Sequence, residues 1–395
     1  MKTPFDILDP LCYITSMTQT LIRNYEYRIY PNATQRRVLF NTLRVCKDLY
    51  NACLERRKTL YETTGKGMGV YTQIKERATY GIDLSSVYSQ VTQNVCARVD
   101  NAFKGFFRRV KHGEKPGYPR FKSLARYDSF TYPQSGFKIL DKHVVLSKIG
   151  TVKIKKHREL PEGSKIKTCT VRKNCLNQWF VVLSIEIPTE VVNTTGNDVV
   201  GIDVGCESFL TLSTGEKLEH PHLYKKFEKR LANAQAKYAK LKQRPKVDKA
   251  KRKAKYRKNK LYTKVKNQRK DFLHKLSREL VNRFDTLYVE DLNIKGMLKD
   301  NWRNLNKSIC DSGWGYFIQY LAYKAEEAGK KVVKVNPAYT SQICSGCGYM
   351  VKKELSVRRH KCPSCGLDID RDVNAAINIL SFGTKLSNEN VGKSL

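Results

Sequence analysis

Four cysteines in the C-terminal part of the chain have the spacing of a metal site. Two C-x-x-C pairs, separated by fourteen residues, are formed by Cys344, Cys347, Cys362 and Cys365. Two close thiolate pairs suit tetrahedral zinc, and four protein ligands leave no open position for a reactant. The spacing therefore predicts one structural zinc ion, with unliganded or redox-active thiols as the alternative. His360 lies beside the second pair and could replace a cysteine, but the four-cysteine set is complete without it.

Three acidic residues lie within or beside apolar segments, where carboxylates are unusual. Asp203 lies within the apolar stretch "VVGIDVG", Glu290 follows the apolar "TLYV", and Asp372 opens the helical pattern "DRDVNAAINIL". Burying an unpaired carboxylate is unfavourable, so such acids usually have a role. If the three converged, they would favour Mg²⁺, and a pair of ions can hold the attacking and leaving oxygens of a phosphodiester. Taken singly, each has an ordinary explanation: a turn for Asp203, a solvated strand end for Glu290 and a helix N-cap for Asp372.

The net charge of the chain indicates which class of partner it binds. Among 395 residues there are 74 Lys and Arg against 37 Asp and Glu, a formal net charge of +37. Such an excess repels itself in a compact chain and favours a polyanionic partner, nucleic acid first and an anionic membrane surface second. The sequence contains no run of 18 or more apolar residues, so it predicts no membrane span. The N-terminus lacks a secretory pattern, so the cysteines are expected in a reducing compartment, and Met17 is an alternative start.

Periodicity predicts the elements that would position these residues. Alternation near 20–30 predicts a strand, and helical spacing at 33–64 and 84–113 predicts two helices. Short alternating runs between 115 and 190, broken by Gly and Pro, predict a small β-barrel. After the polar segment 191–197, strands and helices mix as in an α/β core, with a long helical region at 222–285.

Two basic segments leave alternatives open. Residues 244–270 contain fourteen Lys and Arg and one acidic residue, which predicts either a helical arm along nucleic-acid phosphates or a disordered basic arm. Between 103 and 122, Phe106, Phe107, Tyr118 and Phe121 alternate with basic residues and could stack on bases. Packing in the core is the favoured interpretation of these aromatic residues.

Several motifs together resemble one protein family. "GIDVG", "VEDLNIKGM", the two C-x-x-C pairs and "DRDVNAAINIL" resemble the TnpB family, transposon-encoded RNA-guided DNA endonucleases related to type V CRISPR effectors. "YPNATQ", "FFRRVKHGEKPGYPRFK" and "DSGWGYFIQYLAYKAEEAG" follow in the family's order, so the resemblance covers roughly residues 20–381. It implies an α+β multidomain fold. An N-terminal β-barrel (wedge) with an inserted helical bundle would precede an RNase H-like (RuvC) α/β core with an inserted zinc ribbon.

The resemblance also implies domain boundaries. These are a flexible leader at 1–19, a barrel at 20–32 and 113–197, a helical recognition insertion at 33–112, a RuvC-like domain at 198–340 and 367–381, a zinc ribbon at 341–366 and a disordered tail at 382–395.

For the chemistry, the resemblance implies two-metal hydrolysis of DNA. Asp203, Glu290 and Asp372 match the family's metal-binding acids and would hold two Mg²⁺ ions, in addition to the structural zinc. Asp372 is preferred to Asp370 because it is the acid directly before "VNAA". The zinc ribbon would position Asp372 and contact nucleic acid through its basic loop.

The implied partners are a guide RNA of the omega-RNA type and a double-stranded DNA target beside a short motif. A monomer with its RNA is expected, in the cytoplasm of a prokaryotic-type cell and associated with the nucleoid. Tyr71, Gln93 and Thr131 fall where the family places DNA-reading residues, but Tyr132 and Pro133 depart from the usual polar neighbours, so the motif that is read would differ. Two alternatives stay open: a catalytically silent RNA-guided DNA binder, and a DDE-type transposase or integrase.

Overall fold

The computed structural model describes residues 19–189, 198–243, 248–300, 303–354 and 356–392. The predicted linker at 191–197 and nearly all of the predicted leader lie outside these residues. The chain divides into two compact units, Met1–Glu190 and Val191–Leu395. None of the described helices is both long enough and apolar enough to cross a bilayer.

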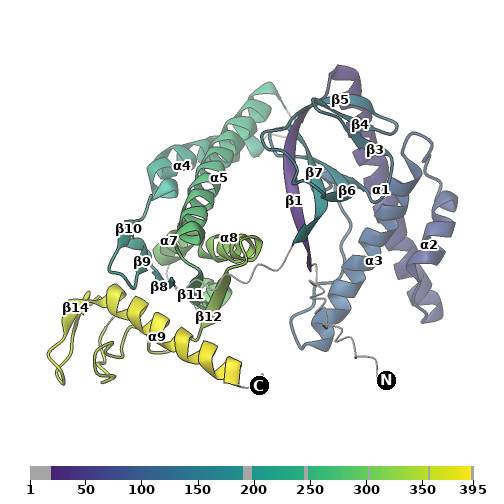
Figure 1. The fold of residues 1–395 in the computed structure, drawn as a ribbon. Coiled ribbons are helices and arrows are strands. Elements are labelled where there is room, and N and C mark those ends of the chain that lie inside the picture. The colour runs from purple at the N-terminus through teal and green to yellow at the C-terminus, as the bar shows by residue number, and fades with distance from the viewer. Residues whose placement is uncertain (1–18, 190–197, 244–247, 301–302, 355, 393–395) are drawn as a thin grey trace, which may run out of the picture. The chain divides into compact units, whose positions relative to one another are not determined.

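The first unit is built on a seven-stranded antiparallel sheet. Its strand order is β2-β6-β7-β1-β5-β4-β3. The bounds are β1 Gln19–Tyr30, β2 Ser129–Tyr132, β3 Phe137–Ile139, β4 His143–Leu146, β5 Gly150–Lys155, β6 Lys165–Lys173 and β7 Trp179–Thr189. Side chains join the edge strand β2 to the other end of the sheet. The Tyr132 hydroxyl donates to Ser147 O, directly after β4, over 2.9 Å, and the ring centroids of Tyr132 and Phe137 of β3 are 6.4 Å apart. The sheet is therefore nearly closed, in agreement with the predicted barrel (Figure 1).

The helices of the first unit lie between β1 and β2 in the sequence. They are α1 Ala33–Thr64, α2 Val70–Glu76, the 3-10 turn η1 Arg77–Thr79 and α3 Ser89–Lys111. Asn32 and Gln35 cap each other's backbone N–H at the start of α1, and Gly65 ends it in the left-handed region. The prediction of α1 is confirmed, whereas α3 begins five residues later than the predicted 84, and α2 was not predicted.

The second unit contains a five-stranded mixed sheet in the order β10-β9-β8-β11-β12. The strands are β8 Val199–Val204, β9 Ser208–Leu212, β10 Lys217–Glu219, β11 Thr286–Glu290 and β12 Lys331–Val335. β8, β11 and β12 run parallel, while β9 and β10 are antiparallel to their neighbours. The helices are α4 Leu223–Lys242, α5 Lys249–Arg283, α6 Ile294–Asp300, α7 Arg303–Ser312, α8 Trp314–Glu327 and α9 Arg371–Gly392.

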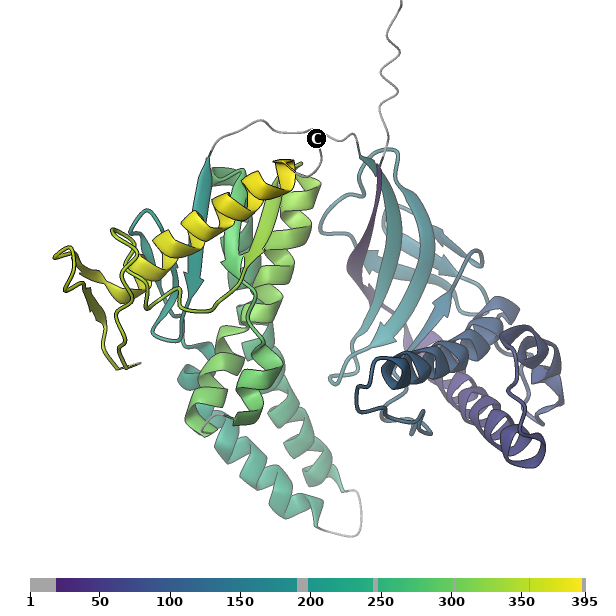
Figure 2. The same ribbon diagram turned by 90° about the horizontal axis from the view of Figure 1, so that it is seen from below.

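The two faces of this sheet are covered by different helices. Val200 and Ile202 belong to the same buried cluster as Leu273 of α5 and Phe317 of α8. On the other face, α9 packs so closely on β8 that a Cβ on Gly201 would collide with the Ala376 carbonyl oxygen. Figure 2 shows α9 lying across the strands. Gly201 is therefore one of the residues that permit this helix to approach the sheet.

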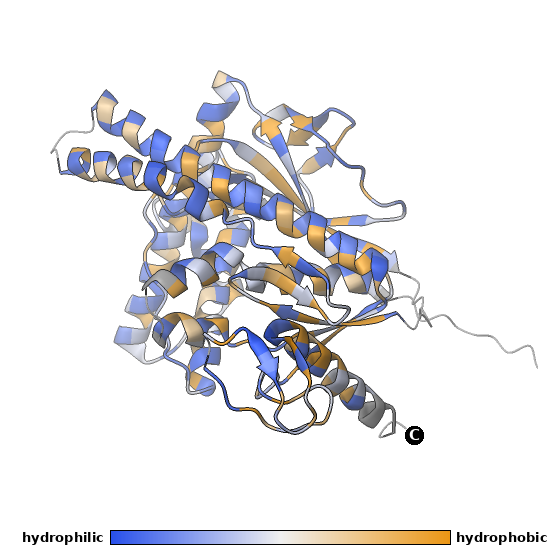
Figure 3. Cartoon of the chain, turned by 90° about the vertical axis from the view of Figure 1, so that its left-hand side faces the viewer, coloured by the Kyte–Doolittle hydropathy of each residue, from blue (hydrophilic) through white to orange (hydrophobic). Residues whose placement is uncertain are grey.

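The helical region predicted at 222–285 consists of two helices, α4 and α5, that pack side by side (Figure 1). Most of the basic segment at 244–270 lies in α5, which favours the helical arm over the disordered one. Hydrophilic and hydrophobic residues alternate along both helices (Figure 3). The basic residues from Lys249 to Lys270 therefore lie on a helix.

The prediction that residues 382–395 form a disordered tail is wrong for most of this segment. α9 continues to Gly392. Phe382 packs against a cluster containing Tyr288 and Ile379, and the Tyr288 hydroxyl lies 3.2 Å from the Ser387 hydroxyl. The polar composition of this segment suggested solvent exposure. A helix, however, needs only one apolar face to remain docked on a sheet.

Candidate metal centres

Strand alternation puts two of the candidate acids on one face of the sheet. Side chains two residues apart on a strand point to the same face, so Asp203 shares the face of Gly201, and Glu290 shares that of Tyr288. Gly201 and Tyr288 both meet α9. β8 and β11 are parallel neighbours, paired up to Ile202 and Val289. Asp203 and Glu290 are the next residues of these strands, so they stand beside each other at the carboxyl ends.

The third acid comes from the first turn of α9. Asp370 accepts hydrogen bonds from the backbone N–H groups of Asp372 and Val373, at 2.9 and 3.2 Å. It also pairs with Lys217 over 2.6 Å. Burial opposes ionisation of Asp370, but these donors together lower its pKa. Asp370 therefore caps the helix, and Asp372, which is not the cap, carries its carboxylate in the first turn.

The three acids interact electrostatically. Burial, followed by the charge of Glu290 and then of Asp372, raises the pKa of Asp203 to about 8. Burial also raises the pKa of Glu290, although a hydrogen bond donated by Thr340 Oγ1 over 2.6 Å opposes this. An oxygen-rich group of acids that resists ionisation by itself is suited to hard divalent cations, whose charge favours the ionised form.

Arginines near the cysteine-rich segment supply positive charge to Asp372. Arg371 donates through Nε and Nη2 to Asp372 Oδ1, at 3.1 and 3.0 Å. Arg358 Nη1 lies 4.0 Å from Asp372 Oδ2, and its Nη2 pairs with Glu207 over 2.7 Å. Among the described residues, the four cysteines alone bring three or more potential ligand atoms within 4.8 Å of one another. The three acids thus face one region without meeting at one point.

The four predicted zinc ligands do come together. The sulfur atoms of Cys344 and Cys365, and those of Cys347 and Cys362, are 3.6 Å apart. The two halves repeat one geometry: Gly348 N–H donates to Cys344 O, and Gly366 N–H to Cys362 O, with both glycines at positive φ. The cluster fits one structural zinc ion, held by four thiolates.

His360 has no place among these ligands, because its ring is buried and its Nδ1 contacts Lys353. His360 lies on β13 Arg359–Lys361, which forms a two-stranded ribbon with β14 Asp368–Asp370.

Two asparagines, missed from the sequence, fasten the cysteine segment to α9. Asn374 accepts from Ser345 N–H over 2.9 Å and donates to Ile343 O over 2.8 Å. Asn378 donates to Thr340 O and to Ile343 O, at 2.8 and 2.7 Å. Thr340 therefore links this asparagine to the Glu290 carboxylate. The available signal was the i, i+4 pair of asparagines on an otherwise apolar helix face.

The residues expected to read DNA lie on three elements of the first unit. Tyr71 is on α2 and is 80% exposed, while Gln93 is on α3 and partly buried. The Thr131 hydroxyl, on β2, is engaged by Arg98 Nη2 at 2.8 Å and by the Thr170 hydroxyl at 2.7 Å. Tyr132, the departure from the family pattern, is buried in the core of the sheet.

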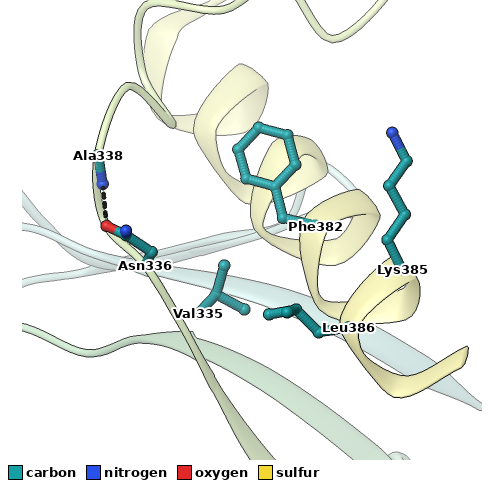
Figure 4. A pocket seen from close by; sticks show the side chains of 6 residues that line it. All are labelled: Val335, Asn336, Ala338, Phe382, Lys385 and Leu386. Carbon is teal, nitrogen blue, oxygen red and sulfur yellow. Dashed lines mark hydrogen bonds between the residues drawn. The ribbon is translucent and has the colours of Figure 1, made fainter. Parts of the chain in front are cut away.

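An apolar cavity of about 300 Å³ lies where β12 ends against α9. Figure 4 shows the six residues that line it: Phe382, Lys385 and Leu386 of α9, and Val335, Asn336 and Ala338 at and after the end of β12. None of the three acids is among these six lining residues. The candidate chemistry therefore belongs to the sheet edge beside the first turn of α9, and not to this cavity.

Comparison with known proteins agrees with this architecture. Residues 314–379 match a family described as "Cas12f1-like, TNB domain", residues 182–301 one described as "Probable transposase", and residues 17–66 one described as "Helix-turn-helix domain". In this chain, the last of these segments folds as the strand β1 followed by the helix α1.

Two full-length relatives place the chain in a family. It is 32% identical over 385 residues to a protein of Streptomyces pristinaespiralis, covering 94% of this chain and 92% of that protein. It is 29% identical over 383 residues to InsQ of Escherichia coli (strain K12), with 92% of each covered. Both carry the name "Putative RNA-guided DNA endonuclease". The chain belongs to the TnpB family of RNA-guided DNA endonucleases, which confirms the resemblance seen in the motifs.

The fold has a solved counterpart. A Cas12f1 chain from a complex with sgRNA and target DNA matches with a TM-score of 0.58 at 15% identity, covering 91% of this chain and 98% of that one. The α+β, multidomain character of the predicted fold is thus confirmed.

Proposed function

We propose that this protein is an RNA-guided DNA endonuclease of a transposable element that cuts target DNA beside a short motif. The observation that carries the proposal is the grouping of Asp203, Glu290 and Asp372, in which burial and the neighbouring acids raise the pKa of Asp203 to about 8. We further propose that the second unit is an RNase H-like (RuvC) core with the zinc ribbon at 341–366 inserted before its last helix. The names of the full-length relatives support this function.

The acids would act as ligands for Mg²⁺. Carboxylate oxygens are the donors this cation prefers, and two bound ions would supply an activated water and stabilise the leaving 3′-oxygen. In this chain, Thr340 orients Glu290 through its 2.6 Å hydrogen bond. Arg371 holds Asp372 and offsets its charge. The four cysteines would hold zinc in a structural role and keep the segment before α9 folded.

Sequence specificity in this proposal comes from RNA. The guide RNA pairs with one strand of a double-stranded target, while the protein holds the duplex by shape and backbone charge. The net charge of +37 and the basic helix α5 fit that role. We propose that Tyr71, Gln93 and Thr131 contribute to reading the motif, and that the protein works as a monomer with its RNA in the cytoplasm of a prokaryotic-type cell.

The test is to express the protein with the DNA that flanks its gene and to sequence the RNA that co-purifies. A discrete RNA with a fixed scaffold, followed by Mg²⁺-dependent cutting of a plasmid carrying the matched target, is the expected result. Asp203→Ala should bind the same RNA and leave the plasmid intact. Binding without cutting by the wild-type protein would favour the silent RNA-guided binder. Strand-transfer products from transposon ends would favour a DDE-type transposase.

A further inference from the structure

The end of α3 and the loop that follows it carry a partly exposed aromatic surface, which we define as Phe103, Phe106, Phe107 and Tyr118; Phe103 and Phe106 are partly buried. Tyr118 turns back from the loop, and its ring lies 5.6 Å from Phe103 and 5.5 Å from Phe106. The ring centroids of Phe107 and Phe106 are 5.2 Å apart. Phe107 is 60% exposed and Tyr118 is 47% exposed. The favoured sequence interpretation, that these aromatic residues pack in the core, is therefore wrong for Phe107, Tyr118 and Phe121, the last of which is 50% exposed.

The loop that carries Tyr118 is fastened to the rest of the unit. Arg109 Nη2 donates to Gly117 O over 3.3 Å. Further along, Asn51 of α1 exchanges two hydrogen bonds with the backbone of Lys122, at 2.8 and 3.0 Å. The rings are thus presented by a supported loop, so an incoming ligand would meet a largely preformed surface.

The charge around these rings selects one kind of partner. Residues 104–126 contain eight Lys and Arg and a single acidic residue, Glu114. Protein interfaces exclude charge from their centres, whereas surfaces for unpaired nucleic acid combine aromatic rings with basic residues. A base pair inside a duplex hides its faces, so only unpaired bases can stack on Phe107.

We propose that the aromatic surface binds an unpaired stretch of the guide RNA by stacking bases on Phe107 and Tyr118. This rests on the proposed function, since it names a contact made by that function's RNA. The guide is the partner we choose because it stays bound between encounters with DNA. Permanently exposed aromatic rings favour aggregation, and a resident partner would keep them covered.

The binding test uses full-length protein and fluorescence anisotropy with an unstructured single-stranded RNA, the same RNA annealed to its complement, and single-stranded DNA of the same sequence. Phe107→Ala should weaken binding of the single-stranded RNA about 5- to 150-fold. Duplex binding and the slope of affinity against salt should stay as in the wild type, because no charge is removed. Phe107→Tyr, which keeps the ring, should restore binding.

Tyr61→Ala is the matched control, since Tyr61 is 63% exposed on α1 of the same unit. It should bind all three nucleic acids as the wild type does. An unchanged affinity of Phe107→Ala for single-stranded RNA would overturn the proposal, as would an equal loss for the duplex. A loss confined to single-stranded DNA would assign the surface to a DNA strand and overturn the choice of RNA.

Cross-linking separates this proposal from the proposed function. Ultraviolet irradiation of the protein with its co-purified RNA should leave an RNA adduct on the peptide containing Phe107 or Tyr118. Asp203→Ala, which is defective only in cutting under the proposed function, should give the same adduct. Adducts found only elsewhere, in a protein that cuts its target, would overturn the aromatic surface and leave the nuclease proposal standing.

Discussion

The two candidate metal centres of the second unit are assembled in opposite ways. The four cysteines lie within twenty-two consecutive residues, Cys344 to Cys365, and two similar glycine turns bring their sulfur atoms together. The three acids are spread from Asp203 to Asp372, and two strands and a helix N-terminus must dock before they share one region. The cysteine centre is thus a local structure, whereas the acid centre depends on the whole unit. Each prediction below tests that difference.

Asp203→Ala is expected to have the largest effect on activity. Under the proposed function, removing a ligand shared by the catalytic ions should lower the rate of plasmid cutting by about 10³-fold or more. Binding of the co-purified RNA should not change, because the substitution removes a carboxylate and leaves every basic residue in place. Cutting assays under single-turnover conditions measure the effect. Wild-type cutting by this variant would exclude Asp203 from the chemistry.

Cys362→Ser should damage both activity and folding. Loss of one thiolate from a four-cysteine site weakens zinc binding, and that binding stabilises the segment attached to α9 through Asn374 and Asn378. Cutting should fall and bound zinc, measured by elemental analysis, should drop from about one per chain to near zero. Cys310→Ser is the control, since Cys310 is exposed and lies outside the cluster. Full zinc content in Cys362→Ser would remove Cys362 from the ligands.

Gly201→Ala tests the docking that assembles the acid centre. A Cβ at this position would meet the Ala376 carbonyl and the Leu380 backbone of α9, so the helix must shift. We expect the free energy of unfolding to fall by about 1–3 kcal/mol, with a further loss of cutting. Gly67→Ala, in the loop before α2, is the control, because nothing lies near the added Cβ and the φ of Gly67 is outside the left-handed region. Chemical denaturation of both variants measures the difference, and equal stability would mean that α9 tolerates the displacement.

Asp203→Asn should change stability in the opposite direction to Gly201→Ala, and only above about pH 4. The folded-state pKa of Asp203 is about 8, raised from 3.8, so between these values the unfolded chain loses its proton first. Stability from this group is therefore present at low pH and is lost as the pH rises through that range. Without divalent cations, the variant should be more stable than the wild type by about 1–3 kcal/mol at pH 7, and equal to it near pH 4. Thermal unfolding in EDTA at both pH values tests this, and an advantage that does not grow with pH would contradict it.

Local sequence patterns predicted elements well where a single signal dominated. The alternation in β1 and the helical spacing of apolar residues in α1 each gave an element near its observed bounds. The short helix α2 was missed because seven residues give too few apolar positions for a period. The segment after Leu380 was misjudged because its polar composition hid the face that packs on Tyr288. The subdivision of each unit into domains stays a prediction.

What the sequence alone determined was the chemistry available: thiolates at zinc spacing, acids in apolar strands, and an excess of positive charge. These features follow from residue types and short spacings, which can be recognised without knowing the contacts between distant segments. Only the tertiary structure decided that Asp370, and not Asp372, caps α9, that Thr340 holds Glu290, and that Phe107 faces solvent. Each of these depends on which segments meet across long separations in the chain. Short sequence patterns do not indicate these long-range contacts, because the contacts result from the packing of whole elements against one another.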